Sequence, residues 1–173
     1  MGKSYTISDD AKTIDVTIRD GEKWSDGEPY TTEDVAYTFN LLNSNKALNT
    51  SGFAGSAKVL SDTEVRITLD KPESVNALSY LSGTMIVPKH VWEKIDDPVT
   101  YTNKDAVGSG PFTVKGGNFS PTAYTFKKNP YYWDEGKPEI DGVRYVLITG
   151  GTQASQNALT AGDVDVCDLP EYG

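Results

Sequence analysis

The sequence predicts an α+β fold built from mostly antiparallel sheets and short helices, and three observations support this class. Runs in which apolar and polar residues alternate, many of them β-branched, occur at 13–19, 65–69 and 122–127, and this period is typical of half-buried strands. Two of these runs adjoin a second run across a short turn sequence, which favours hairpins over parallel crossovers. Helical spacing of apolar residues is confined to short segments, of which 31–42 is the most regular.

The first part of the chain is expected to form a small antiparallel sheet with two or three helices. Its predicted elements are, in order, a strand at 13–19, a helix at 31–42, a hairpin of 57–60 with 65–69, a helix at 74–81, a short buried strand at 84–87 and a helix at 88–94. The first helix begins at Thr31 or Thr32, where Asp34 provides the carboxylate of an approximate capping box. Trp24, in the turn-rich loop before it, is interpreted as an aromatic side chain that covers the core. The second helix is expected to bury the apolar residues on one of its faces, Val75, Leu78 and Leu81.

Two polar segments of the first part have no periodicity and are expected to be loops. Residues 43–56 are rich in Asn, Ser and Gly, and residues 96–106 contain Pro98. A boundary between two parts of the chain is placed after the second of these segments, near residues 106–108.

The second part begins with a Val-Gly-Ser-Gly-Pro-Phe run at 107–112. Glycine permits positive φ and close backbone approach, and proline then fixes φ. Gly108 and Gly110 are therefore interpreted as a rigid corner before Pro111. The elements expected after it are strands at 112–115 and 122–127 joined by a loop at 116–121, a strand at 143–148, a helix at 152–161 and a last strand at 164–166.

Length, charge and cysteine content restrict the class of protein. At 173 residues the chain is expected to form one domain or two small lobes. Its net charge of −9 and its sequence pI of about 4.5 argue against a nucleic-acid partner, because neutralising phosphates requires clustered Lys and Arg side chains. Cys167 has no second cysteine to pair with and is interpreted as a buried structural thiol. No apolar run reaches the length of about 18 residues that indicates a membrane span, and no signal peptide is recognised.

No combination of residues indicates a catalytic residue, a metal site or a cofactor. His90 is the single histidine and lies in a charged helix, so it is expected on the surface rather than in a nucleophile–base relay. Ser109 lies between glycines but not in the Gly-x-Ser-x-Gly order of a nucleophile elbow. Asp163 and Asp165 share one strand face without the spacing of a calcium loop, which favours a solvated face. The glycine pair at 150–151 offers amides to an anion before a helix, but no Walker lysine follows it.

Four motifs occur in a fixed order along the chain. A turn-rich acidic segment fills 20–35, Gly-Ser-Gly-Pro-Phe fills 108–112, Lys-Asn-Pro-Tyr-Tyr-Trp fills 128–133 and Gly-Asp-Val-Asp-Val fills 162–166. Together they resemble the family 5 extracellular solute-binding proteins, whose members carry a Gly-Thr-Gly-Pro-Tyr-like corner and an Arg-Asn-Pro-x-Tyr-Trp segment. The chain departs mildly from that pattern, at Ser109, Phe112 and Lys128.

The resemblance implies where this chain belongs in a larger fold. It would be part of the N-terminal lobe of a periplasmic-binding-protein type II-like fold. Residues 1–107 would form the small accessory subdomain of that lobe, and residues 108–173 an incomplete part of its main sheet. Both ends of the natural chain are then expected outside these residues. An export signal would precede residue 1, and the protein would be extracytoplasmic, in the periplasm or as a cell-surface lipoprotein.

The resemblance also implies a function of capture rather than catalysis. A protein of this class is the substrate-binding component of an ATP-driven importer, and this one is expected to be a monomer that binds a peptide and delivers it to an ABC permease in the membrane. Nickel chelates and sugars are further ligands within the family. Ser109 and Gly110 are expected to contact the ligand through backbone amides that face a cleft, although a tight turn needed for packing explains the same residues. Tyr80 is added because its segment, 78–83, resembles a stretch near the cleft.

The sequence leaves both the ligand contacts and the class of function open. Tyr and Trp suit ligand clefts because they combine apolar area with one polar group. The aromatic residues in question are Trp24, Tyr80, Trp92, Tyr131, Tyr132 and Trp133, and most of them are expected in the core or in a lid. An acidic, Tyr-rich β structure also suits a non-transport extracellular interaction domain. A small hydrolase that uses a carboxylate pair is the other alternative.

Overall fold

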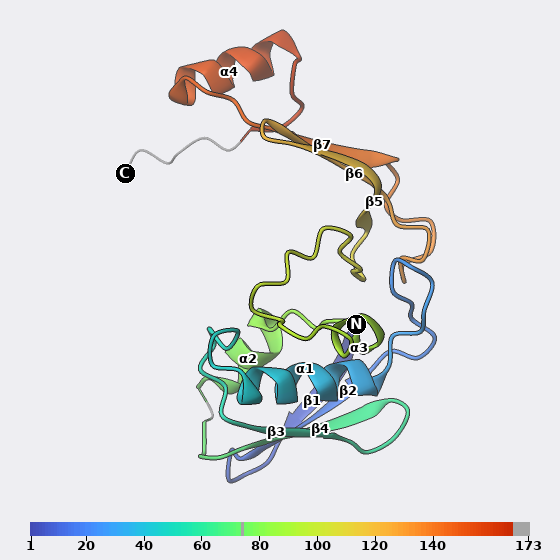
Figure 1. Cartoon of the computed structure of the whole chain (residues 1–173), viewed down its shortest axis with the longest axis vertical. Helices are drawn as coiled ribbons and strands as arrows, with labels where there is room; N and C mark the ends of the chain where they lie inside the picture. Colours follow the sequence, from blue (N-terminus) through green and yellow to red (C-terminus); the bar gives the residue numbers. More distant parts are fainter. Residues whose placement is uncertain (74, 168–173) are drawn as a thin grey trace.

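A computed structural model of the chain describes residues 1–73 and 75–167 and confirms the predicted α+β class. Within these residues, Figure 1 shows a four-stranded sheet with three helices near the N-terminus and a three-stranded sheet with one helix toward the C-terminus. The strands are β1 (Gly2–Ile7), β2 (Thr13–Ile18), β3 (Gly55–Val59), β4 (Glu64–Leu69), β5 (Phe112–Ser120), β6 (Ala123–Lys128) and β7 (Gly142–Val146). The helices are α1 (Thr32–Ser44), α2 (Ala77–Gly83), α3 (Lys89–Trp92) and α4 (Gly151–Ala161). None of the helices in the described ranges is long and apolar enough to cross a membrane.

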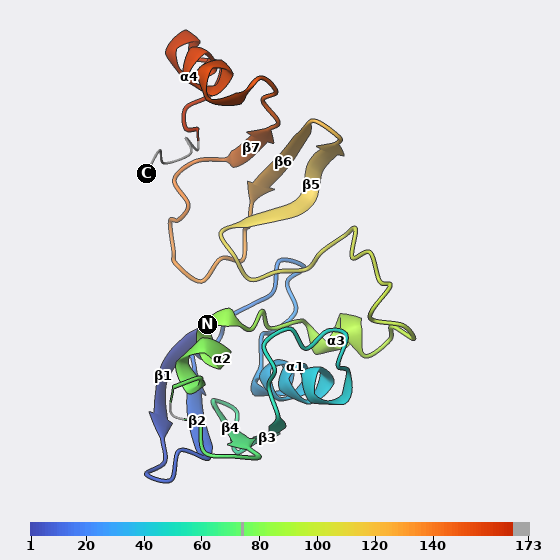
Figure 2. The ribbon, with the colours of Figure 1, turned by 90° about the vertical axis from the view of Figure 1, so that its left-hand side faces the viewer.

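The first sheet has the strand order β1-β2-β4-β3, and each neighbouring pair is antiparallel. α1 packs across β3 and β4, as the side view in Figure 2 shows. The alternation in β4 buries Val65, Ile67 and Leu69. Phe39 of α1 and Phe53 of the following loop extend this core through an edge-to-face contact, with ring centroids 4.9 Å apart. A contact of this geometry adds about 0.5–1.5 kcal/mol to the effect of burial alone.

The local predictions for the first part are confirmed where short-range chemistry determines the structure. Thr31 is the N-cap of α1 and Asp34 completes the capping box, with the Thr31 amide donating to Asp34 Oδ2 over 2.8 Å. Such a box satisfies amide groups that the first helical turn leaves unpaired. Trp24 is buried, as expected for an aromatic that covers the core. The predicted hairpin is the antiparallel pair of β3 and β4, and the loop before it spans residues 45–54.

The second sheet has the order β5-β6-β7 and is also antiparallel. The loop predicted at 116–121 is wrong, because β5 continues to Ser120 and a bulge between Thr113 and Asn118 absorbs the irregular pairing. The register places three aromatic residues opposite one another on one face, Phe119, Tyr124 and Tyr145. All three are exposed, so this face is largely open to solvent.

Two of the predicted short strands are wrong. Residues 84–87 and 164–166 form no strand, and Met85 is 87% exposed while Val166 is similarly open. An apolar run suggested the first strand and alternation of apolar and polar residues the second, but neither segment pairs with a described strand. Conversely, the sequence prediction lacks β1, whose residues are mostly exposed and which forms by antiparallel pairing with β2.

The predicted inward face of the second helix is also wrong. α2 buries Ala77 and Tyr80, whereas Val75 is 85% exposed and Leu78 is half exposed. Tyr80 determines this orientation, since its ring packs against that of Phe53 with centroids 5.6 Å apart. Position 74, where this helix was expected to begin, lies outside the described residues. α3 is a single turn at the start of its predicted helix, and α4 agrees with its predicted bounds to within one residue.

The corner at residues 108–110 does not require glycine. Neither Gly108 nor Gly110 has a positive φ. A Cβ at Gly108 would meet no heavy atom within 4 Å, and one at Gly110 would meet only the Phe112 carbonyl oxygen, at 4.0 Å. The expectation that these glycines provide positive φ or close backbone approach is therefore wrong. Close approaches occur instead within the two sheets, at Gly55, Gly117 and Gly142. At Gly55, a Cβ would lie 2.1 Å from the carbonyl oxygen of Thr68.

We expect Gly55→Ala to lower the free energy of unfolding by about 1–3 kcal/mol, because the added methyl group forces β3 away from β4. In Gly110→Ala, the added Cβ has open space around it. This variant is expected to change the free energy of unfolding by less than about 0.5 kcal/mol. Urea denaturation of the two variants measures the difference. Equal midpoints for both variants would contradict the close approach at Gly55.

Candidate ligand-binding site

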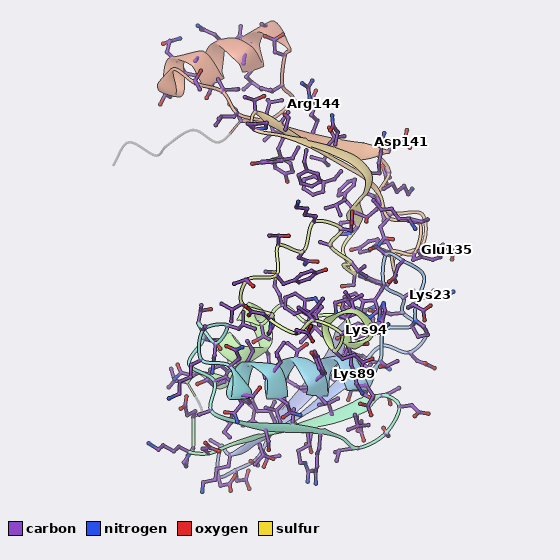
Figure 3. The ribbon with its side chains drawn as sticks, viewed as in Figure 1. Lys23, Lys89, Lys94, Glu135, Asp141 and Arg144 are labelled. Atoms are coloured by element: carbon purple, nitrogen blue, oxygen red, sulfur yellow. The ribbon has the colours of Figure 1, made fainter. Side chains whose placement is uncertain are left out.

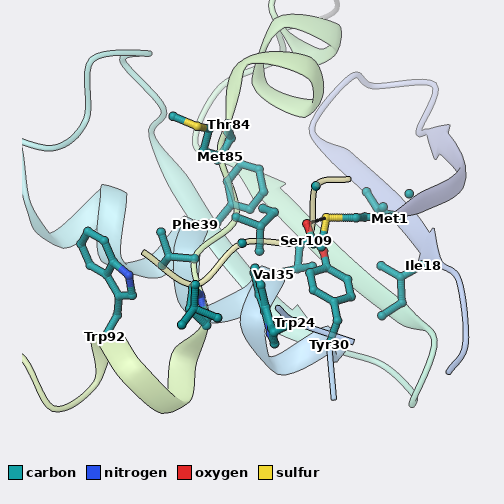
Figure 4. A pocket seen from close by; sticks show the side chains of 18 of the residues that line it. Met1, Ile18, Trp24, Tyr30, Val35, Phe39, Thr84, Met85, Trp92 and Ser109 are labelled. Carbon is teal, nitrogen blue, oxygen red and sulfur yellow. Dashed lines mark hydrogen bonds between the residues drawn. The ribbon is translucent and has the colours of Figure 1, made fainter. Parts of the chain in front are cut away.

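A cavity of about 840 Å³ lies between the core of the first part and the linker that leads to β5. Its floor consists of side chains from β2, from the loop before α1 and from α1 itself. Its rim comes from residues 84–88, from α3 and from residues 106–110, as Figure 4 shows. Small-molecule sites in proteins typically have volumes of about 300–1,000 Å³, so this cavity has a suitable size for a small ligand.

The cavity is mainly apolar and contains a few hydroxyl groups. Trp24, Tyr30 and Phe39 provide aromatic surface. The Ser109 hydroxyl donates to the sulfur of Met1 over 2.6 Å, a bond drawn as a dashed line in Figure 4. A thioether sulfur is a weak acceptor, and a ligand oxygen would be a stronger one for this hydroxyl. The arrangement therefore suits a ligand with an apolar body and a hydrogen-bonding group.

The structure brings two of the three predicted site residues together. Ser109 and Gly110 both line the cavity. Tyr80 does not line it, because its side chain is buried under α2 and its hydroxyl donates to Glu73 Oε2 over 2.8 Å. Ligand contact by Ser109 and Gly110 remains a prediction. For Tyr80 it is a prediction that would require this buried side chain to become accessible.

Other lining residues have no signal in the sequence. Tyr30 lies in a turn-rich loop without periodicity, and Met85 lies in a run that reads as a buried strand. No spacing rule connects positions 30, 85 and 109, and only the folded chain places them around one cavity. Two residues of the aromatic set, Trp24 and Trp92, do line it.

The ionisable groups around the cavity are fixed by near neighbours. Burial raises the pKa of the Tyr30 hydroxyl above its usual value, and the charges of Asp34 and Glu22 raise it further. Tyr30 is therefore neutral at physiological pH. Outside the lining, His90 Nε2 lies 2.8 Å from Asp26 Oδ2, and this contact joins α3 to the loop before α1.

The remaining chemical candidates give no site. Among residues 1–73 and 75–167, no three His, Cys, Asp or Glu side chains are grouped so as to hold a metal ion. Asp163 and Asp165 are exposed but lie outside any strand. Cys167 is free and partly exposed, so its interpretation as a buried thiol is wrong. The glycine pair at 150–151 leads directly into α4.

Comparison with known proteins gives a consistent set of similarities. Residues 1–173 match the family described as bacterial extracellular solute-binding proteins, family 5 Middle. Protein XP55 of Streptomyces lividans is 32% identical over 168 residues, which cover 95% of this chain and 30% of that protein. Dipeptide-binding protein DppE of Bacillus subtilis is 25% identical over 190 residues, covering 98% of this chain and 34% of that protein.

The fold has solved counterparts as well. The ABC transporter substrate-binding protein CtaP of Listeria monocytogenes superimposes with a TM-score of 0.82 and 28% sequence identity, covering 94% of this chain and 34% of CtaP. The chain thus spans about a third of the length of the proteins that it matches.

Alkaline pH is expected to destabilise the fold through Tyr30. The pKa of this hydroxyl is higher in the folded state than in the unfolded state, where it is about 10. Its contribution to stability is therefore complete below about pH 10 and is lost as the pH rises from there toward the pKa of the folded state. The free energy of unfolding should therefore fall above about pH 10, by up to about 1.4 kcal/mol per pH unit for this group. Denaturant titrations over that range measure the slope.

Tyr30→Phe should remove this component of the slope, and Tyr5→Phe, at an exposed tyrosine, is the matched control. Tyr37 and Tyr80, whose pKa values burial also raises, remain in both variants and contribute equally. Identical slopes for the two variants would show that Tyr30 titrates normally.

Proposed function

Since the chain belongs to the bacterial extracellular solute-binding proteins of family 5, we propose that it is part of the substrate-binding component of an ATP-driven importer. Its work is to capture peptides and deliver them to an ABC permease in the membrane. The observation that carries the proposal is the match of all 173 residues to this family. A relative named as a dipeptide-binding protein and a structural counterpart named as an ABC transporter substrate-binding protein support it.

The cavity supports a peptide ligand through its chemistry. An apolar floor accommodates an aliphatic or aromatic side chain, and burying such a side chain contributes about 1.5–3 kcal/mol. The Ser109 hydroxyl and the backbone beside it offer hydrogen bonds to peptide groups. Permissive binding of many peptides requires this combination of an unspecific apolar pocket and contacts to the main chain.

The proposal assigns the two parts of the chain to one lobe of a larger protein. Residues 1–107 are the accessory subdomain, and residues 108–173 belong to the main sheet of the lobe. A second lobe, outside this chain, closes over the ligand by hinge motion. The protein acts as a monomer outside the cytoplasm, in the periplasm or anchored to the cell surface as a lipoprotein.

A hydrolytic function has less support. The family is one of solute-binding proteins rather than enzymes. His90 contacts the Asp26 carboxylate and the Ser109 hydroxyl contacts the Met1 sulfur, so neither residue is hydrogen-bonded to the other as a nucleophile and its base would be.

We expect this chain to bind peptides weakly and a longer polypeptide that contains it to bind them well. With the second lobe absent, contacts and water exclusion from one side of the ligand are lost. Each tenfold change in affinity corresponds to about 1.4 kcal/mol, so losing half of the contacts moves a micromolar ligand beyond a dissociation constant of about 1 mM. Calorimetry of both proteins with a peptide mixture, and then with single peptides, measures this. Micromolar binding by the chain alone would contradict the two-lobe mechanism.

The longer polypeptide also tests where the ligand binds. Ser109→Trp places an indole ring at the cavity wall and is expected to weaken peptide binding at least about tenfold by occupying the space of the ligand. Ser56→Trp, at an exposed position of β3 away from the cavity, is the matched control and should bind as the parent does. Unchanged affinity in the Ser109 variant would place the peptide elsewhere.

A further inference from the structure

We propose that Ser25 and Asn129 are positioning residues that hold the wall of the cavity, residues 108–110, in place for the ligand. The ligand part of this inference rests on the proposed function, whereas the anchoring itself depends only on the fold. Both residues lie outside the cavity lining, and neither would contact a ligand directly.

Ser25 holds the first residue of the wall. Its amide donates to the Gly108 carbonyl oxygen over 2.8 Å, and the Gly108 amide donates in return to Ser25 Oγ over 3.2 Å. Ser25 is 5% exposed, so water does not compete for these bonds. The loop that carries it is itself fixed, since the neighbouring Trp24 amide donates to the Glu28 carbonyl oxygen over 2.8 Å.

Asn129 holds the last residue of the wall. Its Nδ2 donates to the Gly110 carbonyl oxygen over 2.8 Å, and its Oδ1 accepts from the Tyr131 amide over 3.0 Å. Its own amide donates to the Pro111 carbonyl oxygen over 2.9 Å. At 1% exposed, the side chain uses both of its ends. A buried amide with both ends paired rigidifies the backbone that it joins, because breaking either bond leaves a polar group without a partner.

The two anchors belong to segments that also contact each other. The loop before α1 rises beside the segment that follows β6 in Figure 1, and Figure 3 labels Lys23 in this region. Lys23 Nζ lies 5.7 Å from the centroid of the Tyr131 ring. The Arg19 guanidinium lies 4.0 Å over the Trp133 ring. Cation–π contacts of this kind contribute about 0.5–1 kcal/mol at exposed sites, so they add to the association of the two segments that carry the anchors.

Ser109 therefore lies between two fixed points. Because the backbone at Gly108 and Gly110 has ordinary φ and open space, the glycines themselves do not impose the shape of the wall. The anchors impose it, and they present the Ser109 hydroxyl at one place in the cavity. A wall that samples other positions lowers the apparent affinity in proportion to the fraction of molecules with the wall in place.

The test compares Asn129→Leu and Ser25→Ala with a matched control, Asn40→Leu, in a longer polypeptide that contains this chain. Asn40 makes the same pair of side-chain bonds, from Nδ2 to the Ala57 carbonyl oxygen and from the Ala57 amide to Oδ1, each over 2.9 Å. It does so between α1 and β3, away from the cavity. Amide hydrogen exchange at Gly108 reports the anchoring, and calorimetry with a peptide that the parent protein binds reports its effect on the ligand.

Both anchor variants should accelerate exchange of the Gly108 amide by at least about tenfold and weaken peptide binding by a similar factor. Asn40→Leu should accelerate exchange at Ala57 alone and leave the affinity unchanged. The proposal is wrong if Asn129→Leu leaves Gly108 protected, or if all three variants weaken binding equally. If the parent protein binds no peptide, the proposed function fails, and exchange at Gly108 still decides the anchoring. If Asn129→Leu does not fold, Asn129→Ser, which keeps a smaller polar group, takes its place.

Discussion

The arrangement of the first part depends on one buried carboxylate, that of Asp34. Its Oδ2 accepts hydrogen bonds from the Thr31 amide at 2.8 Å and from the Trp24 indole nitrogen at 3.3 Å, and its Oδ1 accepts from the Lys89 amide at 2.8 Å. Burying a carboxylate is costly unless donors replace the water that it loses. Here the donors come from three segments, which are the loop before α1, the start of α1 and the start of α3. These segments can reach their positions only together.

Hydrogen bonds to the Asp34 carboxylate position two segments that border the cavity. The bond to Trp24 fixes the loop that carries Ser25, and Ser25 in turn holds Gly108 at the cavity wall. The bond to Lys89 fixes the start of α3, whose Trp92 lines the opposite rim. Two walls of one cavity are thus connected to a single charged group that lies outside the lining. A change at Asp34 is therefore expected to affect both the candidate site and the folded core.

The parts of the fold that could be predicted from the sequence are those formed by residues close together in the chain. The capping box at Thr31 and the hairpin of β3 and β4 involve residues a few positions apart, so sequence patterns predict both. β1 forms only through its pairing with β2, and its own residues are too polar to indicate a strand. The inward face of α2 follows from one contact between Tyr80 and Phe53, 27 residues apart in sequence. A helical period alone cannot choose between that face and the one with Val75.

The same limit applies to the candidate site. Ser109 and Gly110 were identified through a motif, yet the positive φ and close backbone approach expected of its glycines, Gly108 and Gly110, do not occur. Their place at the cavity comes from Ser25 and Asn129, which act over long distances in sequence. Tyr30 and Met85 carry no motif and become part of the site only when β2, α1 and the linker are brought together.

The two parts of the chain differ in how their apolar side chains are covered, and this difference bears on the proposed division at residue 107. Every buried apolar side chain among the described residues lies between Ile14 and Pro88. The first part therefore has a core of its own. In the second part, the aromatic face of β5, β6 and β7 is exposed, and α4 buries none of its residues. Since a sheet gains stability mainly by burying one face, the exposed face of the second part supports the proposal that these strands belong to an incomplete main sheet.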